Sequence, residues 1–407
     1  MRIKTLLAVS LLMLATSGAY AETTLEWWQF WTDPTIKPTI QAIVEDFEKE
    51  NPDIKVKVTD LTWANGHEKL VMAFASGTAP DIVELGSDWL TEFIVNDHIE
   101  DITTYIVPDS SEFVGWSMAT YNSKVYAHPW ILGTRVLFCN RDLIRQAGYD
   151  DIYFPMKWDQ LKEMVKKISA LGDDIYGWGS NTPEKHRLYK KFLPFFWSNN
   201  AQIFTDDNRY CVISSDYAIE ALEYYFDLHN SKAYVADQRG IEDAFLDGKV
   251  GFVISGDWLL KRIKQEKRKL NFFTTLIPGP QFPGKSFMGG EFLAVNKNSE
   301  NKEAALKFID FVTSEENQLR FCKANTAANP SNKYTQTNEY FQLNDNLLVF
   351  IKQLYNSKHP PLDPEWVYIE EIIEKAVEDV LMYIETPSEA LRQAQHQIAA
   401  LKKNEKQ

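Results

Sequence analysis

The chain has 407 residues, of which 44% are hydrophobic and 25% are charged, a composition typical of a folded protein with two domains and not of a disordered one. Its 57 Asp and Glu residues outnumber its 43 Lys and Arg residues, which gives a formal net charge of −14 at pH 7. This acidic balance argues against a nucleic acid as the main partner, because phosphate backbones bind basic surfaces. Aromatic residues make up 13% of the chain, and this surplus of flat apolar side chains needs an explanation.

The first 21 residues have the pattern of a cleavable secretion signal. Arg2 and Lys4 precede an apolar run over residues 6–15, and Ala19-Tyr20-Ala21 forms a cleavage site of the small-x-small type. The apolar run is too short for a stable membrane anchor, and no Cys follows the cleavage point to carry a lipid. We therefore expect residues 1–21 to be removed and the mature chain to be soluble and exported to the periplasm.

The mature chain begins with alternating strand and helix patterns. A β-branched and aromatic segment at 24–31 predicts a strand, and apolar residues at i, i+3, i+4 and i+7 predict an amphipathic helix over 40–50. Strict alternation at 54–58 predicts a second strand, a helix over 65–76 follows, and 81–85 is a short apolar strand. This order is typical of a parallel α/β unit.

The same alternation continues to the C-terminus. Further strands are expected at 125–129, 134–140, 249–255, 272–277 and 291–296. Further helices are expected at 158–171, 217–230, 241–247, 302–313, 369–384 and 388–401. The sequence therefore predicts an α/β fold for the whole mature chain.

The chain lacks the motifs of common enzymes, metal sites and cofactor sites. There is no G-x-S-x-G, no H-E-x-x-H and no G-x-x-x-x-G-K-[ST] segment. The seven His form no i, i+4 pair, and we expect no metal and no cofactor. Cys139, Cys211 and Cys322 show no C-x-x-C spacing; they permit at most one disulfide, and which two would pair stays open. We therefore predict that the protein is not an enzyme.

A run of ordered motifs resembles one family. The segments are FEKENPDIKV (47–56), ASGTAPDIV (75–83), VYAHP (125–129), NRD (140–142), KWDQL (157–161), AFLDGKVGF (244–252) with GDW (256–258), PGP (278–280) with GG (289–290), and KEAALKFIDF (302–311) with SEENQ (314–318). In this order they resemble the extracellular solute-binding proteins of ABC importers, in the carbohydrate-binding group that includes maltodextrin-binding proteins. Cys139, Lys157 and Gly251 depart from the residues usual in the family's motifs, which are Tyr, Thr and Ala.

The resemblance implies a fold and a mode of action. It implies a two-lobed, type II-like periplasmic-binding-protein fold whose hinge the chain crosses three times, near Ile131, Thr275 and Thr313. Lobe one would comprise 22–131 plus 276–314, and lobe two 132–275 plus 315–407. A mono- or oligosaccharide would bind between the lobes, shift the open–closed equilibrium, and pass to the membrane permease subunits of the importer. We expect a monomer without catalysis that binds no nucleic acid.

Candidate binding residues follow from the chemistry of sugars. Sugar hydroxyls need charged or amide partners, while the C–H faces of the rings lie flat on aromatic side chains. Open α/β sheets bind ligands at the loops that follow their strands. The residues that meet these criteria, some of them at positions implied by the resemblance, are Trp31, Asn65, Glu68, Asp88, Trp89, Trp130, Arg135, Trp197, Trp258, Gly290, Glu291 and Trp366.

Three alternatives stay open. The same fold could bind a polyol phosphate or another non-sugar solute, which requires two or more Arg or Lys in the cleft beyond Arg135. A sensor-type binding protein would hand its closed form to a membrane receptor. An exported glycosidase would need a carboxylate pair, for which Asp88 with Glu291 or Asp257 with Glu291 are candidates.

Overall fold

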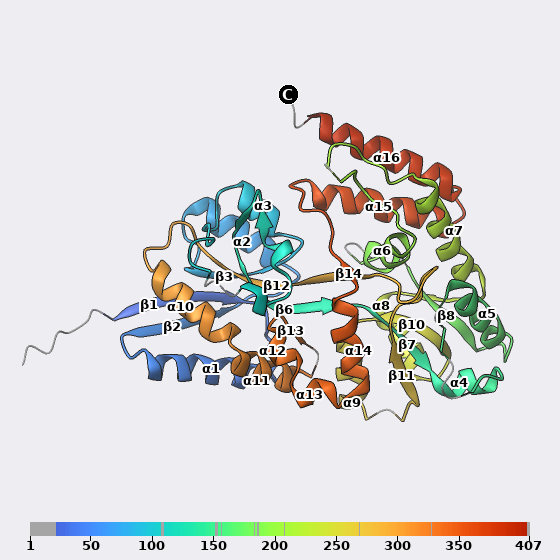
Figure 1. Cartoon of the computed structure of the whole chain (residues 1–407), viewed down its shortest axis with the longest axis horizontal. Helices are drawn as coiled ribbons and strands as arrows, with labels where there is room; N and C mark the ends of the chain where they lie inside the picture. The colour runs from blue at the N-terminus through green and yellow to red at the C-terminus, as the bar shows by residue number, and fades with distance from the viewer. Residues whose placement is uncertain are drawn as a thin grey trace, which may run out of the picture.

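In the computed structural model, the chain folds into two α/β lobes that lie side by side, each built on its own sheet (Figure 1). The structure describes residues 22–404 except 107–109, 151–153, 156, 183, 185–186, 207, 268 and 327. The expected secretion signal at 1–21 lies outside the described residues. None of the helices within them is long and apolar enough to cross a membrane.

The first lobe contains a seven-stranded sheet with the order β13-β6-β12-β3-β1-β2, and β14 pairs with β12. Its strands are β1 (Thr23–Gln29), β2 (Ile54–Asp60), β3 (Ile82–Gly86), β6 (His128–Thr134), β12 (Ser286–Val295), β13 (Asn329–Pro330) and β14 (Ser357–Lys358). β1 pairs in parallel with β2 and β3, whereas β12 runs antiparallel to β3 and β6. The carboxyl ends of β1, β2 and β3 therefore meet at one edge of the sheet.

Helices cover both faces of the first sheet. They are α1 (Lys37–Glu50), α2 (Gly66–Ser76), α3 (Leu90–Val95), α10 (Lys302–Thr313), α11 (Glu315–Asn325), α12 (Lys333–Gln336) and α13 (Glu339–Gln342). One core joins α1, α10 and α11 to one face of the sheet through residues such as Leu25, Phe308 and Phe321. A second core, with Leu70 and Phe93, packs α2 and α3 on the opposite face. A short hairpin, β4 (Thr120–Tyr121) with β5 (Lys124–Val125), precedes β6.

The second lobe contains a five-stranded sheet with the order β11-β7-β10-β8-β9. Its strands are β7 (Val136–Asn140), β8 (Tyr176–Asn181), β9 (Tyr234–Ala236), β10 (Val250–Ser255) and β11 (Phe272–Thr275). β8 is parallel to β9 and β10, and β7 is antiparallel to β10 and β11. The helices of this lobe are α4 (Arg141–Gln146), α5 (Trp158–Ser169), α6 (Tyr189–Ser198), α7 (Asp216–Asn230), α8 (Gln238–Leu246), α9 (Trp258–Gln265), α15 (Trp366–Leu381) and α16 (Pro387–Asn404). Helix α14 (Asp345–Leu354) packs on both lobes.

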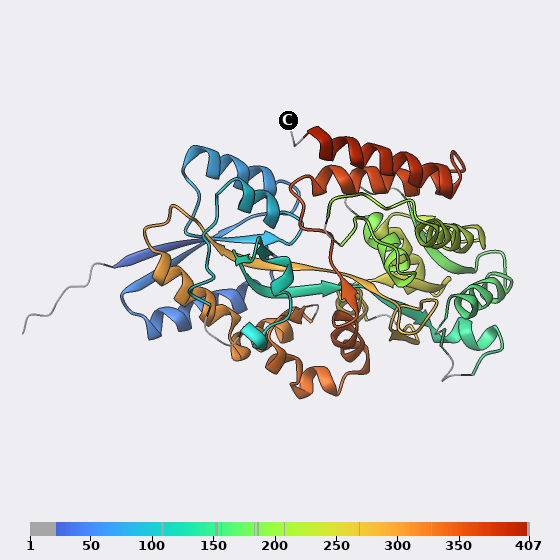
Figure 2. The ribbon, with the colours of Figure 1, turned by 45° about the horizontal axis from the view of Figure 1, so that its top comes forward.

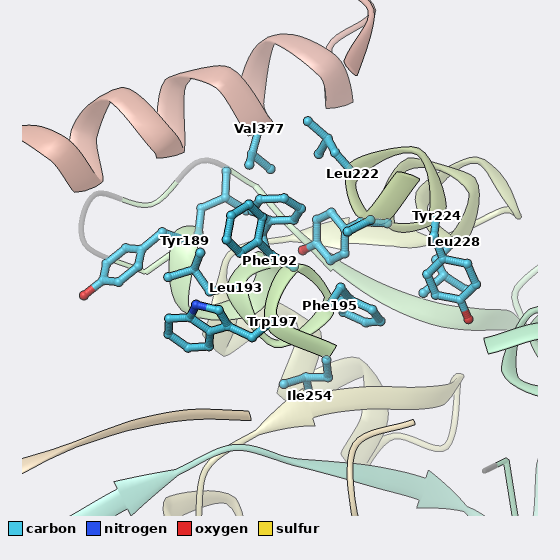
Figure 3. Packing of buried hydrophobic residues seen from close by; sticks show 14 of the residues in the cluster. Tyr189, Phe192, Leu193, Phe195, Trp197, Leu222, Tyr224, Leu228, Ile254 and Val377 are labelled. Atoms are coloured by element: carbon cyan, nitrogen blue, oxygen red, sulfur yellow. The ribbon is translucent and has the colours of Figure 1, made fainter. Parts of the chain in front are cut away.

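Helix α6 lies at the centre of the second lobe. Its rings and aliphatic side chains fill the space between Leu222 of α7, Ile254 of β10 and Val377 of α15 (Figure 3). Such a helix, buried on nearly every side, forms when its sequence is apolar all round, as in YKKFLPFFWS. The pair α15–α16 closes this core from above (Figure 2).

The chain passes between the lobes at three places. Arg135 alone separates β6 from β7, and residues 276–285 lead from β11 back to β12. The third passage differs from the sequence expectation near Thr313. Helix α11 stays on the first lobe, because its buried face carries Phe321 and Cys322 into the core of Leu25. The chain then reaches the second sheet through α14, where Phe350 packs on Phe138 of β7.

Candidate functional site

The carboxyl ends of β1, β2 and β3 face the second lobe across a cleft. Asp88 follows β3, and Tyr189 and Lys190 begin α6 on the opposite side. Lys190 Nζ forms an ion pair with Asp88 Oδ2 at 2.8 Å, and the Tyr189 hydroxyl donates to the same oxygen at 3.4 Å. A small pocket beside this contact is lined by Ser87, Asp88, Thr91, Met118, His359, Pro360, Pro361, Leu362 and Trp366. The lobes are therefore in contact at this end of the cleft.

A second ion pair joins the lobes near the end of β1. Lys261 Nζ of α9 lies 2.7 Å from Asp33 Oδ2 and donates to Asn325 Oδ1 at 3.0 Å. The hydrogen bond from Lys261, reinforced by that from the Thr35 backbone, lowers the pKa of Asp33 to about 2. The structure thus shows a closed arrangement of the lobes, with one ion pair near β1 and one near β3.

Arg135 lies in the connection between the two sheets, and its guanidinium packs on two aromatic rings. The guanidinium carbon is 4.5 Å from the centre of the Trp258 ring and 5.7 Å from that of Phe287. Its Nη1 donates to the Thr134 carbonyl at 3.2 Å, while its buried Nε has no hydrogen-bond partner. Burial lowers the pKa of Arg135, and the nearby Asp257 charge opposes that effect. Arg135 therefore carries a buried donor that no described residue satisfies.

Three acidic side chains near Arg135 and the strand ends, Glu84, Asp257 and Glu291, have raised pKa values. Asp257 accepts a hydrogen bond from Asn329 Nδ2 at 2.7 Å, and burial raises its pKa to about 6. Burial and the charge of Asp257 together raise the pKa of Glu291 to about 8. Glu84, fully buried, accepts from the Phe30 backbone N–H at 2.8 Å, and burial followed by the charge of Glu291 raises its pKa. Protonated carboxyl groups both donate and accept hydrogen bonds, as hydroxyl-rich solutes require.

Trp258 is held in one orientation by two contacts. Its Nε1 donates to Glu242 Oε1 at 2.7 Å, and Glu242 is itself held by Arg262 Nη1 at 2.8 Å. The ring also lies directly over Gly256, where an added Cβ would stand 1.9 Å from Trp258 Cζ3. Any larger residue at 256 would displace the indole, which explains the G-x-W motif in physical terms. The ring is therefore preorganised against Arg135.

A family model described as bacterial extracellular solute-binding protein matches residues 32–319. The chain belongs to this family. It is 27% identical to a binding protein of Brucella abortus, with 88% of each chain covered. It is 24% identical to the maltodextrin-binding protein MdxE of Bacillus subtilis, over 84% of this chain and 82% of that one. The solved structure of the sugar-binding protein MalE from Xanthomonas citri superimposes with a TM-score of 0.85 at 24% identity, over 94% of this chain and 98% of that one. These comparisons confirm the family resemblance and the two-lobed fold.

In this solute-binding protein, six of the sequence-predicted site residues lie around the cleft. Asp88, Arg135, Trp258 and Glu291 have the contacts given above. Gly290 exchanges hydrogen bonds with Ser87, whose N–H donates to its carbonyl at 2.8 Å, and Gly290 N donates to Ser87 Oγ at 3.3 Å. Trp366 lines the small pocket, although it is only 3% exposed and meets Tyr189 edge to face at 5.7 Å.

Three other predicted residues lie in the cores. Trp130 is 1% exposed and contacts Trp27 and Phe321. Trp197 is buried in the second lobe, with its ring stacked over Phe287 at 6.5 Å. Trp31 is partly buried, edge to face with Phe321 at 4.9 Å. These three rings lie in apolar packing, because the strands and helices packed next to them cover them.

The remaining predicted residues, Asn65, Glu68 and Trp89, lie at the outer rim of the first lobe. There Trp89 joins an aromatic group that we call the rim platform, made of Phe30, Trp63, His67 and Trp89. Phe30 stacks on Trp63 at 4.3 Å with an interplanar angle of 22°, and Trp63 lies 5.2 Å from Trp89. The His67 ring is 5.0 Å from Trp89, and its Nε2 contacts Glu92 at 2.7 Å.

Several residues at the site were not among the sequence-predicted binders. Trp63 is the clearest example, and the signal available for it is an indole directly after an alternating strand. Tyr189, Lys190 and Lys261 carried no such signal, because only the docking of α6 and α9 brings them to the cleft. The sequence suggested Asp257 only as one carboxylate of a candidate glycosidase pair.

Among the described residues, the cysteines form no disulfide bond, and the His, Cys, Asp and Glu side chains form no metal site. Cys139, Cys211 and Cys322 are free thiols, and burial raises the pKa of each. No group of three or more His, Cys, Asp or Glu among the described residues could hold a metal ion.

Proposed function

We propose that this protein is the periplasmic substrate-binding subunit of an ABC sugar importer. It captures a mono- or oligosaccharide between its lobes and delivers it to the membrane permease. The observation that carries the proposal is Arg135, stacked on Trp258 with an unsatisfied Nε, close to Asp257 and Glu291, whose pKa values burial raises to about 6 and about 8. Such a site offers a flat ring together with charged and neutral hydrogen-bond partners, which is the combination that sugar rings require. The similarity to MdxE supports a carbohydrate ligand.

The proposed ligand-binding residues are those that reach the cleft in the closed structure. They are Asp88, Arg135, Asp257, Trp258, Glu291 and Trp366. Because Asp88 is neutralised by Lys190 in this structure, ligand hydroxyls would share or replace that ion pair.

The proposed lobes follow the packing of the helices. Lobe one comprises residues 22–134 and 286–342 together with β14, and lobe two comprises residues 136–275 and 359–404. Arg135, residues 276–285 and residues 343–356, which include α14, form the three crossings. This division assigns α11, α12 and α13 to lobe one, since they share its core.

The remaining parts of the proposal concern export and partners. Residues 1–21 would direct export and be removed, so that the mature protein acts in the periplasm as a monomer. Its cleft would bind and release sugar without chemical change.

Calorimetric titration of residues 22–407 with glucose, galactose, arabinose and the malto-, isomalto- and arabino-oligosaccharides tests the proposal. We expect saturable binding of at least one sugar. Arg135→Ala should weaken it about tenfold or more, because a hydrogen bond to a charged group is lost. Arg239→Ala, an exposed arginine of α8, is the matched control and should bind normally. Absence of heat with every sugar, or product formed from a chromogenic glycoside, would contradict the proposal.

A polyol phosphate is the second candidate ligand. The observation that favours it is the guanidinium of Arg135, whose Nε has no hydrogen-bond partner among the described residues. The cleft nevertheless has little excess positive charge, because Lys190 is paired with Asp88 and Asp257 lies near Arg135. Glycerol 3-phosphate in the same titration decides between the two ligands.

A further inference from the structure

We propose that Glu242, a buried carboxylate of α8, is a positioning residue for ligand binding: it holds the Trp258 indole and, through that ring, the Arg135 guanidinium in the orientation that a ligand meets. The inference rests on the proposed function and adds to it a residue that does not touch the ligand. Glu242 is 2% exposed, so it can affect a solute in the cleft only through the side chains that it bonds.

Four hydrogen-bond donors from three elements converge on the Glu242 carboxylate. Its Oε1 accepts from Gln238 Nε2 of α8 at 2.6 Å, from Ser255 Oγ at the end of β10 at 2.7 Å, and from Trp258 Nε1 of α9 at 2.7 Å. Its Oε2 accepts from Arg262 Nη1 at 2.8 Å. A buried network in which each bond supports the others holds its members more firmly than a single bond would. The position of the carboxylate is therefore fixed before it reaches Trp258.

The indole N–H of Trp258 differs from those of tryptophans that fill the cores. Trp27, Trp130 and Trp178 are each 1% exposed, and their buried Nε1 atoms have no hydrogen-bond partner among the described residues. Trp258 is only partly buried, yet its Nε1 is bonded to a buried carboxylate. The core rings are held by apolar packing on every side. Trp258, which packing covers less, is held in its plane by a directed bond.

The fixed ring in turn supports Arg135. The guanidinium carbon lies 4.5 Å from the centre of the Trp258 ring, a distance at which a cation is attracted to the π-face. The ring cannot shift toward Gly256, where an added Cβ would stand 1.9 Å from Trp258 Cζ3 and 2.4 Å from Cε3. The bond to Glu242 opposes rotation away from that place. A loss of this bond should therefore displace the ring and the guanidinium together.

Stability alone gives a weak reason for a carboxylate at position 242. Its neighbours on α8 pack in an apolar core, and a well-packed apolar residue is often as stabilising as a buried ion pair. Arg262 has other partners for its charge, because Asp243 and Glu266 also pair with it. What the Glu242 carboxylate adds is an acceptor for the N–H of Trp258. A ring whose orientation is set in advance binds a ligand at a lower cost in conformational entropy.

The test combines variants of Glu242 and Trp258 in the calorimetric titration, with the sugar that the wild type binds most tightly. Glu242→Met fills a similar space without an acceptor oxygen and should weaken binding about tenfold, the equivalent of one lost hydrogen bond to a charged group. Trp258→Phe keeps a ring but has no N–H, and in that background Glu242→Met should change the affinity less than about twofold. Glu266→Gln removes another partner of Arg262 and is the matched control, with a change below about twofold.

Two further measurements separate positioning from stability. Glu242→Gln retains one acceptor oxygen and the shape of the side chain, so it should weaken binding less than Glu242→Met, and its effect should also disappear in Trp258→Phe. In the ligand-free protein labelled with nitrogen-15, the indole N–H of Trp258, assigned by its absence in Trp258→Phe, should exchange with D2O at least about tenfold faster in Glu242→Met than in the wild type. Circular dichroism confirms that each variant folds.

The outcomes distinguish this inference from the proposed function. Unchanged affinity in Glu242→Met with a lowered melting temperature would assign Glu242 a role in stability alone and overturn the inference, while the sugar-binding function stands. An equal loss of affinity with and without the Trp258 N–H, or an unchanged exchange rate of that N–H, overturns it in the same way. Absence of binding to every sugar by the wild type overturns the proposed function and, with it, a role of Glu242 in ligand binding.

Discussion

The core around α6 in the second lobe and the loop after β2 in the first lobe use aromatic side chains in opposite ways. In the second lobe, Phe192 and Phe195 of α6 are fully buried in a core shared with α7 and α15. In the first lobe, Trp63 at the end of β2 is 48% exposed although it stacks on a buried ring. The difference shows that the aromatic surplus of this chain serves two purposes, filling the cores, as around α6, and forming an open surface at Trp63.

The physical cause lies in where each ring stands on its element. A ring inside a helix is covered when neighbouring helices pack on every side of it, as α7, α15 and β10 do around α6. A ring in the loop after a parallel strand stands at the edge of the sheet, where helices leave the strand ends open. Trp63 and Trp89 occupy that edge, and Trp258 faces it from the second lobe.

The largest effect should come from a ring of the second-lobe core. Phe195→Ala should lower the free energy of unfolding by about 3–5 kcal/mol, because it leaves a cavity among Trp158, Trp178 and Tyr225. Urea denaturation measures the change. A loss below about 1 kcal/mol would show that α6 is loosely packed and would break the contrast between the lobes.

The first lobe buries acidic side chains as well as rings, and pH tests the burial of one of these acids. The pKa of Glu291 is raised from 4.5 to about 8 by burial. A raised carboxyl pKa stabilises the folded state below pH 4.5, and this contribution is lost as pH rises toward 8. The melting temperature of Glu291→Gln should therefore rise relative to that of the wild type as the pH is raised from 5 to 8. A constant difference over this range would contradict the burial of Glu291, and Glu303→Gln on α10 is the control.

The exposed platform should matter less for stability than the core. Trp63→Ala should cost about 1 kcal/mol, since one stacked contact and part of one ring are lost. The same urea denaturation compares it with Phe195→Ala. A loss of unfolding free energy as large as that of Phe195→Ala would mean that Trp63 contributes to stability as a core residue does, contrary to its exposure.

The smallest effect should come from the ion pair between the lobes at Asp33. Lys261→Ala should cost about 0.5 kcal/mol or less, because the carboxylate is partly exposed and solvent screens the pair. Small-angle X-ray scattering without ligand should nevertheless show a larger radius of gyration, as one contact across the cleft is gone. Lys375→Ala, which removes an ion pair within α15, should leave the radius unchanged.

The sequence by itself determined the elements whose apolar residues repeat on one face. The strand at 54–58 and the helix at 302–313 were predicted close to their observed bounds, Ile54–Asp60 and Lys302–Thr313, because such periodicity is local. Helix α6 was missed. Its sequence is apolar on nearly every side and contains Pro194, so no single face stands out. The ordered motifs were sufficient to identify the family and hence the two-lobed fold.

Only the tertiary structure decided which tryptophans are open to a ligand. Trp130 and Trp63 both lie at or near the end of a predicted strand, yet one is 1% and the other 48% exposed. The exposure of each depends on what packs over it: α11 brings Phe321 onto Trp130, whereas Gly86 leaves Trp63 uncovered at the edge of the cleft. Composition and periodicity indicate the secondary structure that one segment prefers. The covering of a side chain depends on segments distant in the sequence, and these meet only in the folded protein.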